Sequence, residues 1–161
     1  MFIHNLSLTF ARDLASVKAE ILAYPDDTTP CATPPGAPNS GGNLALHIAG
    51  NLRHFIGAGL GQTGYVRNRE AEFATTSGTR ADLAALIDAT AAEVATGMKA
   101  ATDEALAAPI IVATITLPVS RALLHLAIHL GYHLGQLDYH RRLVTGDKTS
   151  VGTMGLPPLA G

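Results

Sequence analysis

The chain of 161 residues is 47% hydrophobic and suits a single domain, residues 1–161, with a buried core. Eleven Lys and Arg against thirteen Asp and Glu give a formal net charge of −2, and no basic cluster is present to follow a nucleic-acid backbone. No stretch reaches the roughly 18 apolar residues of a membrane-spanning helix, the start lacks a secretory signal, and Cys31 alone cannot form an internal disulfide. These features predict a soluble, cytoplasmic protein whose partners include neither nucleic acid nor membrane.

Apolar residues recur every three or four positions near the start of the chain, which is the pattern of one buried helical face. These positions are Leu6, Phe10, Leu14, Val17, Ile21 and Tyr24. They predict a helix over residues 5–24. The following residues, 25–43, are rich in Pro and Gly and predict a long loop. A loop of more than about 12–15 residues is typically functional or disordered, and a crossing between distant ends of a bundle is a third interpretation.

Two helices are predicted in the middle of the chain. Residues 43–56 carry apolar side chains on one stripe, and the glycines that follow predict the end of this helix. A charged segment, YVRNREAEF, comes next. The second of these helices begins near Thr79, whose hydroxyl group and the acidic Asp82 three residues later are typical of a capping box.

The last helix is predicted to follow an extended link. Residues 109–118 are rich in β-branched side chains, which favour extended backbone. A helix then runs from Pro118 to about Val144 and ends at Gly146. Four amphipathic helices with almost no strand predict an all-α fold, a four-helix bundle.

Three histidines, His125, His129 and His133, follow one another at four-residue intervals in this last helix. On a helical wheel, His129 and His133 lie beside the apolar stripe and His125 lies further round. Two His side chains four residues apart have Cβ atoms about 6 Å apart, so both rings can reach one metal ion at about 2.0–2.1 Å. His47 has a similar edge position on the helix over 43–56 and offers a third ligand.

Three neutral imidazoles leave part of a metal's coordination shell open, which is typical of catalytic rather than structural sites. The alternative is that these rings are core histidines held by hydrogen bonds to the backbone or to Gln136. A matched pair on one helix together with His47 favours the metal. His125 is expected to face solvent or to support the ligands, although a shift of the ligand set by one turn would make it a ligand itself.

Further polar residues are candidates for the surroundings of the site. Gln136 could orient a ligand or donate to a substrate oxygen, and Asn51 could serve a pocket or an interhelix hydrogen bond. Arg67 could hold a substrate carboxylate at the pocket mouth, together with its charged neighbours, or belong to a solvated loop. These neighbours are Arg69, Glu70 and Glu72.

The other reactive side chains are expected to have no direct part in the site. We interpret His4, His54 and His140 as surface or packing residues. Cys31 lies in a Pro-rich loop without an adjacent base to activate its thiol. No general base is predicted, because the positions assigned to the interior lack Asp and Glu.

The segments LALHIAGNLRHFIG and HLAIHLGYHLGQLDYHRR, some eighty residues apart, resemble the DinB-like superfamily, which includes bacillithiol-dependent transferases and mycothiol-dependent maleylpyruvate isomerases. The resemblance covers nearly the whole chain. It implies a four-helix bundle of up-down-down-up order, with the first long loop as the crossover. It also implies a divalent metal, Ni, Zn, Fe or Mn, bound by His47, His129 and His133, and activation of a low-molecular-weight thiol in members of known activity.

Two hypotheses for function follow from these residues. The first is a metal-dependent enzyme, a thiol-dependent S-transferase or a related enzyme in which the metal activates a nucleophile that attacks a small molecule. The second is a non-catalytic bundle that binds a metal or small ligand for sensing, storage or stress response. An open pocket beside Arg67 would favour the enzyme, and a fourth protein ligand such as His125 would favour a structural site.

The outer face of the last helix predicts self-association. Leu124, Ile128, Gly131 and Gly135 lie opposite the core stripe on the helical wheel. A helix that is apolar on two faces must be covered on both, and glycines permit close approach of a second helix. We therefore expect a homodimer, unless residues 109–118 cover this face.

Overall fold

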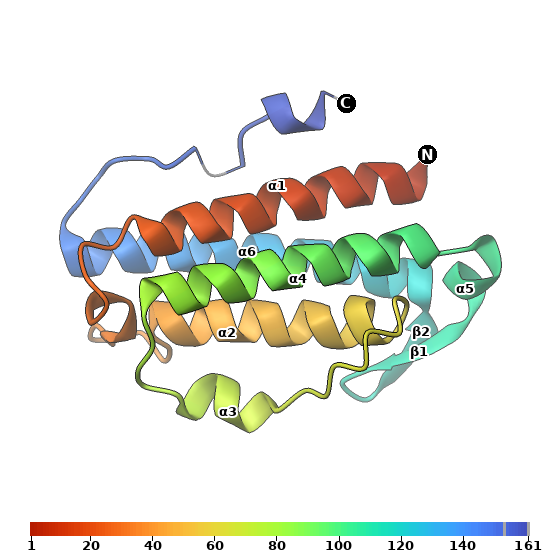
Figure 1. Ribbon diagram of the computed structural model, residues 1–161, viewed down its shortest axis with the longest axis horizontal. Coiled ribbons are helices and arrows are strands. Elements are labelled where there is room, and N and C mark those ends of the chain that lie inside the picture. Colours follow the sequence, from red (N-terminus) through yellow and green to blue (C-terminus); the bar gives the residue numbers. More distant parts are fainter. Residues whose placement is uncertain (153, 161) are drawn as a thin grey trace.

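The computed structural model describes residues 1–152 and 154–160 (Figure 1). Within these residues the long helices are α1 (Phe2–Leu22), α2 (Gly41–Leu52), α4 (Arg80–Ala100) and α6 (Val119–Thr145). The shorter elements are η1 (Thr29–Cys31), η2 (Arg53–Ala58), α3 (Arg69–Ala74), α5 (Asp103–Ala107), β1 (Pro109–Val112), β2 (Ile115–Pro118) and η3 (Pro157–Leu159). The fold is mostly helical, as predicted. None of the helices described combines the length and the apolar character that crossing a bilayer requires.

The long helices pack around one apolar core. α1 lies against α4 and α6, and α2 contacts the same two helices. In Figure 1, α1 and α6 run from right to left, whereas α2 and α4 run from left to right. Each helix contributes side chains that are at most 1% exposed, among them Phe10, Ile48, Ile87 and Leu126. The two helices that carry the candidate ligands His47, His129 and His133, α2 and α6, are therefore neighbours in space.

Local signals determine where the helices begin and end. α1 buries the predicted stripe, although it begins at Phe2 and ends at Leu22, both earlier than predicted. At the start of α4, the Thr79 side chain accepts a hydrogen bond from the backbone N–H of Asp82, which confirms the predicted cap. α6 ends where Gly146 adopts a left-handed conformation with φ +71°, as the C-terminal glycine predicts.

The connections differ from the prediction. The first loop, residues 23–40, joins α1 to α2 at one end of the molecule (Figure 1). Its interpretation as a crossing between distant ends is therefore wrong. The segment that runs along the molecule is 53–79, because α2 and α4 start at the same end and the chain must return between them. This segment begins as η2, a π-helical continuation of α2 beyond the predicted end, and contains α3, where no helix was predicted.

The predicted extended link is a short hairpin. β1 and β2 pair antiparallel, with Pro109 opposite Pro118 and Val112 opposite Ile115. Ala113 in the tight turn has a φ of +55°. Both strands contact α6, yet Leu124 and Ile128 of that helix remain 46% and 73% exposed. The hairpin therefore leaves the outer apolar face of α6 uncovered.

Acidic side chains lie inside the molecule at positions that the sequence pattern did not assign to the interior. Asp13 and Glu20 of α1 are 2% and 0% exposed, and Glu72 of α3 is 5% exposed. Glu20 forms an ion pair with Arg141 of α6, whose side chain is also fully buried. Buried charges require such partners, because removal from water is otherwise costly.

Candidate metal centre

Three histidine rings from two helices converge on one point. His47 lies on α2, and His129 and His133 lie one turn apart on α6. The Nε2 atom of His129 lies 3.4 Å from Nε2 of His47 and 3.1 Å from Nε2 of His133. One ligand atom from each of the three residues lies within 4.8 Å of the other two. The group could hold a metal ion.

These distances fit a shared cation better than they fit hydrogen bonds among the rings. Two nitrogens that bind one tetrahedral metal at about 2.0–2.1 Å lie about 3.3 Å apart. The observed separations of 3.1 and 3.4 Å bracket that value. In addition, the outer nitrogens of His47 and His133 face hydrogen-bond acceptors, so the inner nitrogens of these rings carry lone pairs. One proton on His129 could satisfy only one of these lone pairs, whereas a cation would bind all three rings.

Glu72 of α3 determines the orientation of His47. The Nδ1 atom of His47 donates to Oε2 of Glu72 over 2.9 Å. Arg67 holds the same carboxylate with two hydrogen bonds, from Nε to Oε1 at 2.6 Å and from Nη2 to Oε2 at 2.8 Å. The carboxylate fixes the proton on Nδ1, which leaves the Nε2 lone pair directed at His129.

Local sequence explains how Glu72 reaches the interior. The side chain of Asn68 caps α3 by accepting from the backbone N–H of Ala71, which turns the next residue inward. Gly50 of α2 makes room, since a Cβ atom there would overlap the Glu72 carboxylate. A glycine in the middle of a helix costs about 0.5–1 kcal/mol, so its presence is a signal of close approach. In the sequence, Gly50 could have indicated that another segment approaches α2 closely, but not that Glu72 is the residue that does so.

Gln136 orients the ring of His133 as Glu72 orients that of His47. Its Oε1 atom accepts a hydrogen bond of 2.7 Å from Nδ1 of His133. Because an amide oxygen is an acceptor, the proton lies on Nδ1 and the Nε2 lone pair faces the cluster. Gln136 thus lies in contact with a ring of the cluster.

Burial keeps these rings neutral, which is the form that binds metals. It lowers the pKa of His129 to about 4, and the charges of His133 and His47 act in the same direction. The pKa of His47 is lowered because its burial outweighs the favourable contact with Glu72. Burial likewise lowers the pKa of His133. At neutral pH no proton needs to be displaced before a cation enters.

The remaining candidates have different positions. His125 is exposed, and its ring centroid lies 5.9 Å from that of His129, outside the converging group.

Asn51, one turn after His47, is 7% exposed, and its Oδ1 atom is buried without a hydrogen-bond partner among the described residues. The alternative of an interhelix hydrogen bond from this atom is therefore not observed. Arg69 and Glu70 are exposed, as expected, although they lie in the first turn of α3 rather than in a loop.

His140 is a buried packing residue rather than a surface residue. It is 5% exposed, and both of its nitrogens have protein partners. Nδ1 accepts from the Tyr24 hydroxyl at 2.6 Å, and Nε2 donates to the carbonyl oxygen of Ala32 at 2.8 Å. His140 thereby fastens the first loop to α6.

The cluster retains an accessible side. His47 is buried, whereas His129 and His133 are only half-buried. No carboxylate or fourth imidazole joins the three rings within the described part of the chain. Three nitrogen ligands with an open face are the arrangement of sites that bind an exchangeable ligand.

Comparison with known protein families places this geometry in context. The model of the DinB superfamily matches residues 10–137, which include His47, His129 and His133. Comparisons with curated proteins and with solved structures gave no significant match. The matched span covers most of the chain and all of the converging histidines, and the chain therefore belongs to the DinB superfamily.

Proposed function

We propose that the protein is a metal-dependent enzyme in which His47, His129 and His133 hold a divalent cation, Ni, Zn, Fe or Mn. The observation that carries this proposal is the convergence of three Nε2 atoms at 3.1 and 3.4 Å. Support comes from the hydrogen bonds behind two of the rings, which fix their tautomers. A surface histidine that binds no metal does not require a fixed tautomer.

The reaction class that these residues support best is transfer of a low-molecular-weight thiol to a small electrophile. A divalent metal supplies Lewis acidity, which lowers the pKa of a coordinated thiol or water. Glu72 and Arg67 hold His47, and Gln136 holds His133, so the ligands need no reorganisation during the reaction. The attacking sulfur comes from the cofactor, since the three rings have no nucleophilic side chain among them.

Asn51 has a role in the same proposal. Its buried Oδ1 atom lacks a partner in the described residues, and it lies one turn beyond His47 on the same side of α2. An unpaired buried acceptor is unfavourable by about 1–3 kcal/mol. A proton on the exchangeable ligand of the site would satisfy it. Asn51 would then orient this ligand, and His125, which is exposed on α6, would border its entry.

The test measures metal content and thiol conjugation on the same preparations. Protein is purified without an affinity tag or chelating resin, and elemental analysis is done for the wild type, His133→Ala and His125→Ala. Formation of a thioether is then followed with a panel of low-molecular-weight thiols and 1-chloro-2,4-dinitrobenzene. We expect about one metal per chain and accelerated conjugation for the wild type and His125→Ala, and neither for His133→Ala.

Each other outcome has a distinct meaning. Equal metal content in the wild type and His133→Ala contradicts the ligand set. Loss of metal in His125→Ala would make His125 a ligand. Normal metal content without conjugation for any thiol contradicts the enzyme and supports the alternative, a non-catalytic bundle that binds a metal or small ligand.

We also propose that the helices form the up-down-down-up four-helix bundle of the superfamily and that the protein is a homodimer. Two features support a dimer through α6. Leu124 and Ile128 are exposed on one face, and a Cβ atom added to Gly131 or Gly135 would meet no atom within 4 Å. Light scattering should give twice the chain mass for the wild type and the monomer mass for Ile128→Glu. A monomeric wild type contradicts the proposal.

A further inference from the structure

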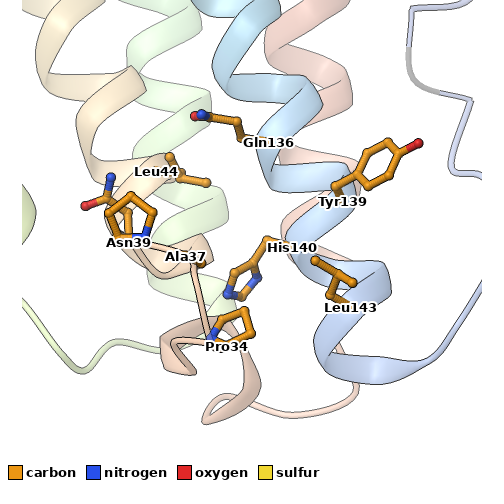
Figure 2. A pocket seen from close by; sticks show the side chains of 9 residues that line it. Pro34, Ala37, Asn39, Leu44, Gln136, Tyr139, His140 and Leu143 are labelled. Carbon is orange, nitrogen blue, oxygen red and sulfur yellow. The ribbon is translucent and has the colours of Figure 1, made fainter.

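A cavity lies between the first loop and the adjoining ends of α2 and α6 (Figure 2). Its volume is about 230 Å³, the space of about eight water molecules at ~30 Å³ each, or of one aromatic ring with a short substituent. Pro34 and Ala37 line it from the loop, Leu44 from α2, and Gln136 and His140 from α6.

The walls of the cavity are apolar and carry no ionic side chain. Among the described residues that line it, none is Asp, Glu, Lys or Arg. His140 presents its ring but no free nitrogen, because Tyr24 and the carbonyl oxygen of Ala32 already bind both. A ligand with a formal charge would therefore lose hydration without gaining a counter-charge, which disfavours carboxylates and ammonium groups.

Two carboxamides provide the polar part of the lining, Asn39 at the loop and Gln136 on α6. Gln136 uses its Oε1 atom to accept from His133, while its Nε2 amide has no hydrogen-bond partner among the described residues. An amide N–H donates to carbonyl, ether or hydroxyl oxygens without requiring a charge. Gln136 therefore connects the cavity to the cluster of three histidines through a single hydrogen bond.

A second cavity lies near the cluster but is connected to it through a charged residue, Glu72. It has a volume of about 220 Å³ and is lined by Tyr65, Asn68 and Glu72, among others. Both carboxylate oxygens of Glu72 are already bound by His47 and Arg67, and the Asn68 side chain caps α3. The second cavity adjoins the cluster through a carboxylate that is already paired, whereas the first adjoins it through the neutral Gln136 amide, so the cavity bordered by Gln136 is the better site for an uncharged ligand.

We propose that the cavity between the first loop, α2 and α6 is the substrate subsite and that it takes a small uncharged molecule with an apolar body and an acceptor oxygen bound by the Gln136 amide. The position of this subsite beside the reacting metal rests on the proposed function. Selection of uncharged ligands rests only on the lining of the cavity, so the two inferences can be tested separately.

The experiment is an NMR titration of the full chain, without added metal, with benzamide and with benzoate. These probes share a phenyl ring and differ in charge. We expect benzamide to shift the side-chain amide signals of Gln136 and Asn39 with saturation, and benzoate to bind at least about tenfold more weakly. Equal binding of the two probes, or shifts that do not include Gln136, would overturn the proposal.

Variants of the first loop and of α6 locate the binding. Ala37→Trp fills the cavity and should abolish the benzamide shifts, whereas Thr33→Trp, at an exposed position of the same loop outside the cavity lining, should leave them unchanged. Gln136→Glu keeps an acceptor for His133 but replaces the donor, and should weaken benzamide binding about tenfold. Undiminished binding in folded Ala37→Trp refutes the subsite. If that variant is unfolded, undiminished binding in Gln136→Glu refutes it.

Metal content measured on the same samples separates this inference from the proposed function. Wild-type metal content without benzamide binding overturns the subsite and leaves the metal centre. Benzamide binding in a protein that takes up no Zn²⁺ when the metal is added overturns the metal centre and leaves a ligand cavity selective for uncharged molecules.

Discussion

α6 carries a half-buried histidine, His133, and a buried one, His140, two turns apart, and the nitrogens of the two rings have different partners. His140 has a protein partner for each nitrogen, the Tyr24 hydroxyl and the Ala32 carbonyl. His133 has a partner for Nδ1 only, and its Nε2 atom faces His129 at 3.1 Å. Both residues are histidines of one helix, and burial lowers the pKa of each.

This difference distinguishes a structural histidine from a histidine that can bind a metal ion. A buried ring whose two nitrogens are both satisfied completes a local network and has no capacity for a ligand. In the other case a protein group accepts from one nitrogen of the ring, and the lone pair of the second nitrogen faces the nitrogens of other imidazoles. A cation can bind that lone pair. Burial and pKa alone do not distinguish the two cases.

The largest expected effect comes from removing a ring of the cluster. His129→Ala should abolish binding of one Zn²⁺ per chain, because two imidazoles remain of the three. His140→Gln, the matched change in the other environment, should keep the Zn²⁺ dissociation constant within about twofold. Competition with a chromophoric chelator measures both. If both variants bind Zn²⁺ equally, the distinction between the two environments fails.

A smaller loss of affinity is expected when the support of His47 is weakened. Glu72→Gln removes the negative charge that accepts from the His47 ring and pairs with Arg67. Changes to such supporting groups typically reduce metal affinity about 10–100-fold. Glu70→Gln, at an exposed position of the same helix, is the control and should have no effect. Isothermal titration with Zn²⁺ distinguishes the two, and an unchanged affinity of Glu72→Gln would contradict the orienting role.

The environment of His140 should respond in stability rather than in metal affinity. A Cβ atom at Gly41 would overlap the Tyr24 hydroxyl and crowd Nδ1 of His140. Gly41→Ala should therefore lower the free energy of unfolding by about 1–3 kcal/mol, the usual cost of overpacking. Gly42→Ala, where the nearest atom to the added Cβ is the Pro30 carbonyl oxygen at 3.6 Å, should not destabilise the fold. Urea denaturation measures the two free energies of unfolding. Equal midpoints for the two variants would contradict the claim that the Tyr24–His140 contact stabilises the fold.

The smallest effect is a dependence of stability on pH. Burial lowers the pKa of His140 in the folded protein, so the unfolded chain takes up a proton first as the pH falls below about 6.5. The unfolded state then binds more protons, and stability contributed by neutral His140 is lost as the pH falls through this window. The slope for one proton cannot exceed about 1.4 kcal/mol per pH unit.

Comparison of metal-free wild type with His140→Gln isolates this contribution. The free energy of unfolding of the wild type should fall more steeply between pH 7 and pH 5 than that of the variant. Contributions of the other histidines are common to both proteins and cancel. Identical pH profiles would mean that protonation of His140 does not differ between the folded and unfolded states.

Helix positions were largely predictable, because local chemistry determines them. The stripe of α1, the Thr79 cap and the stop at Gly146 each depend on residues within a few positions of one another. The direction of the connections was not predictable in this way. The first loop is long and rich in Pro and Gly, yet it joins neighbouring helix ends, whereas the crossing segment is 53–79.

The residues of the candidate site were likewise predictable where they depend on local spacing and not predictable where they depend on contacts between distant segments. Spacing in the last helix predicted that His129 and His133 share a face, and the edge position of His47 predicted that it could join them. Nothing in the local pattern distinguished Glu72 from Glu70, although the first is buried against His47 and the second is exposed. Their difference depends on the placement of α3 against Gly50 of α2, a contact between segments that propensity does not describe.

The sequence by itself determined the helices, their buried faces and the identity of the three imidazoles, since helical periodicity depends only on neighbours along the chain. Tertiary structure alone decided which nitrogen of each ring is free, which carboxylate supports His47, and where an uncharged cavity adjoins the cluster. Those properties arise from groups far apart in sequence that share one low-dielectric interior, where each polar atom must find a partner.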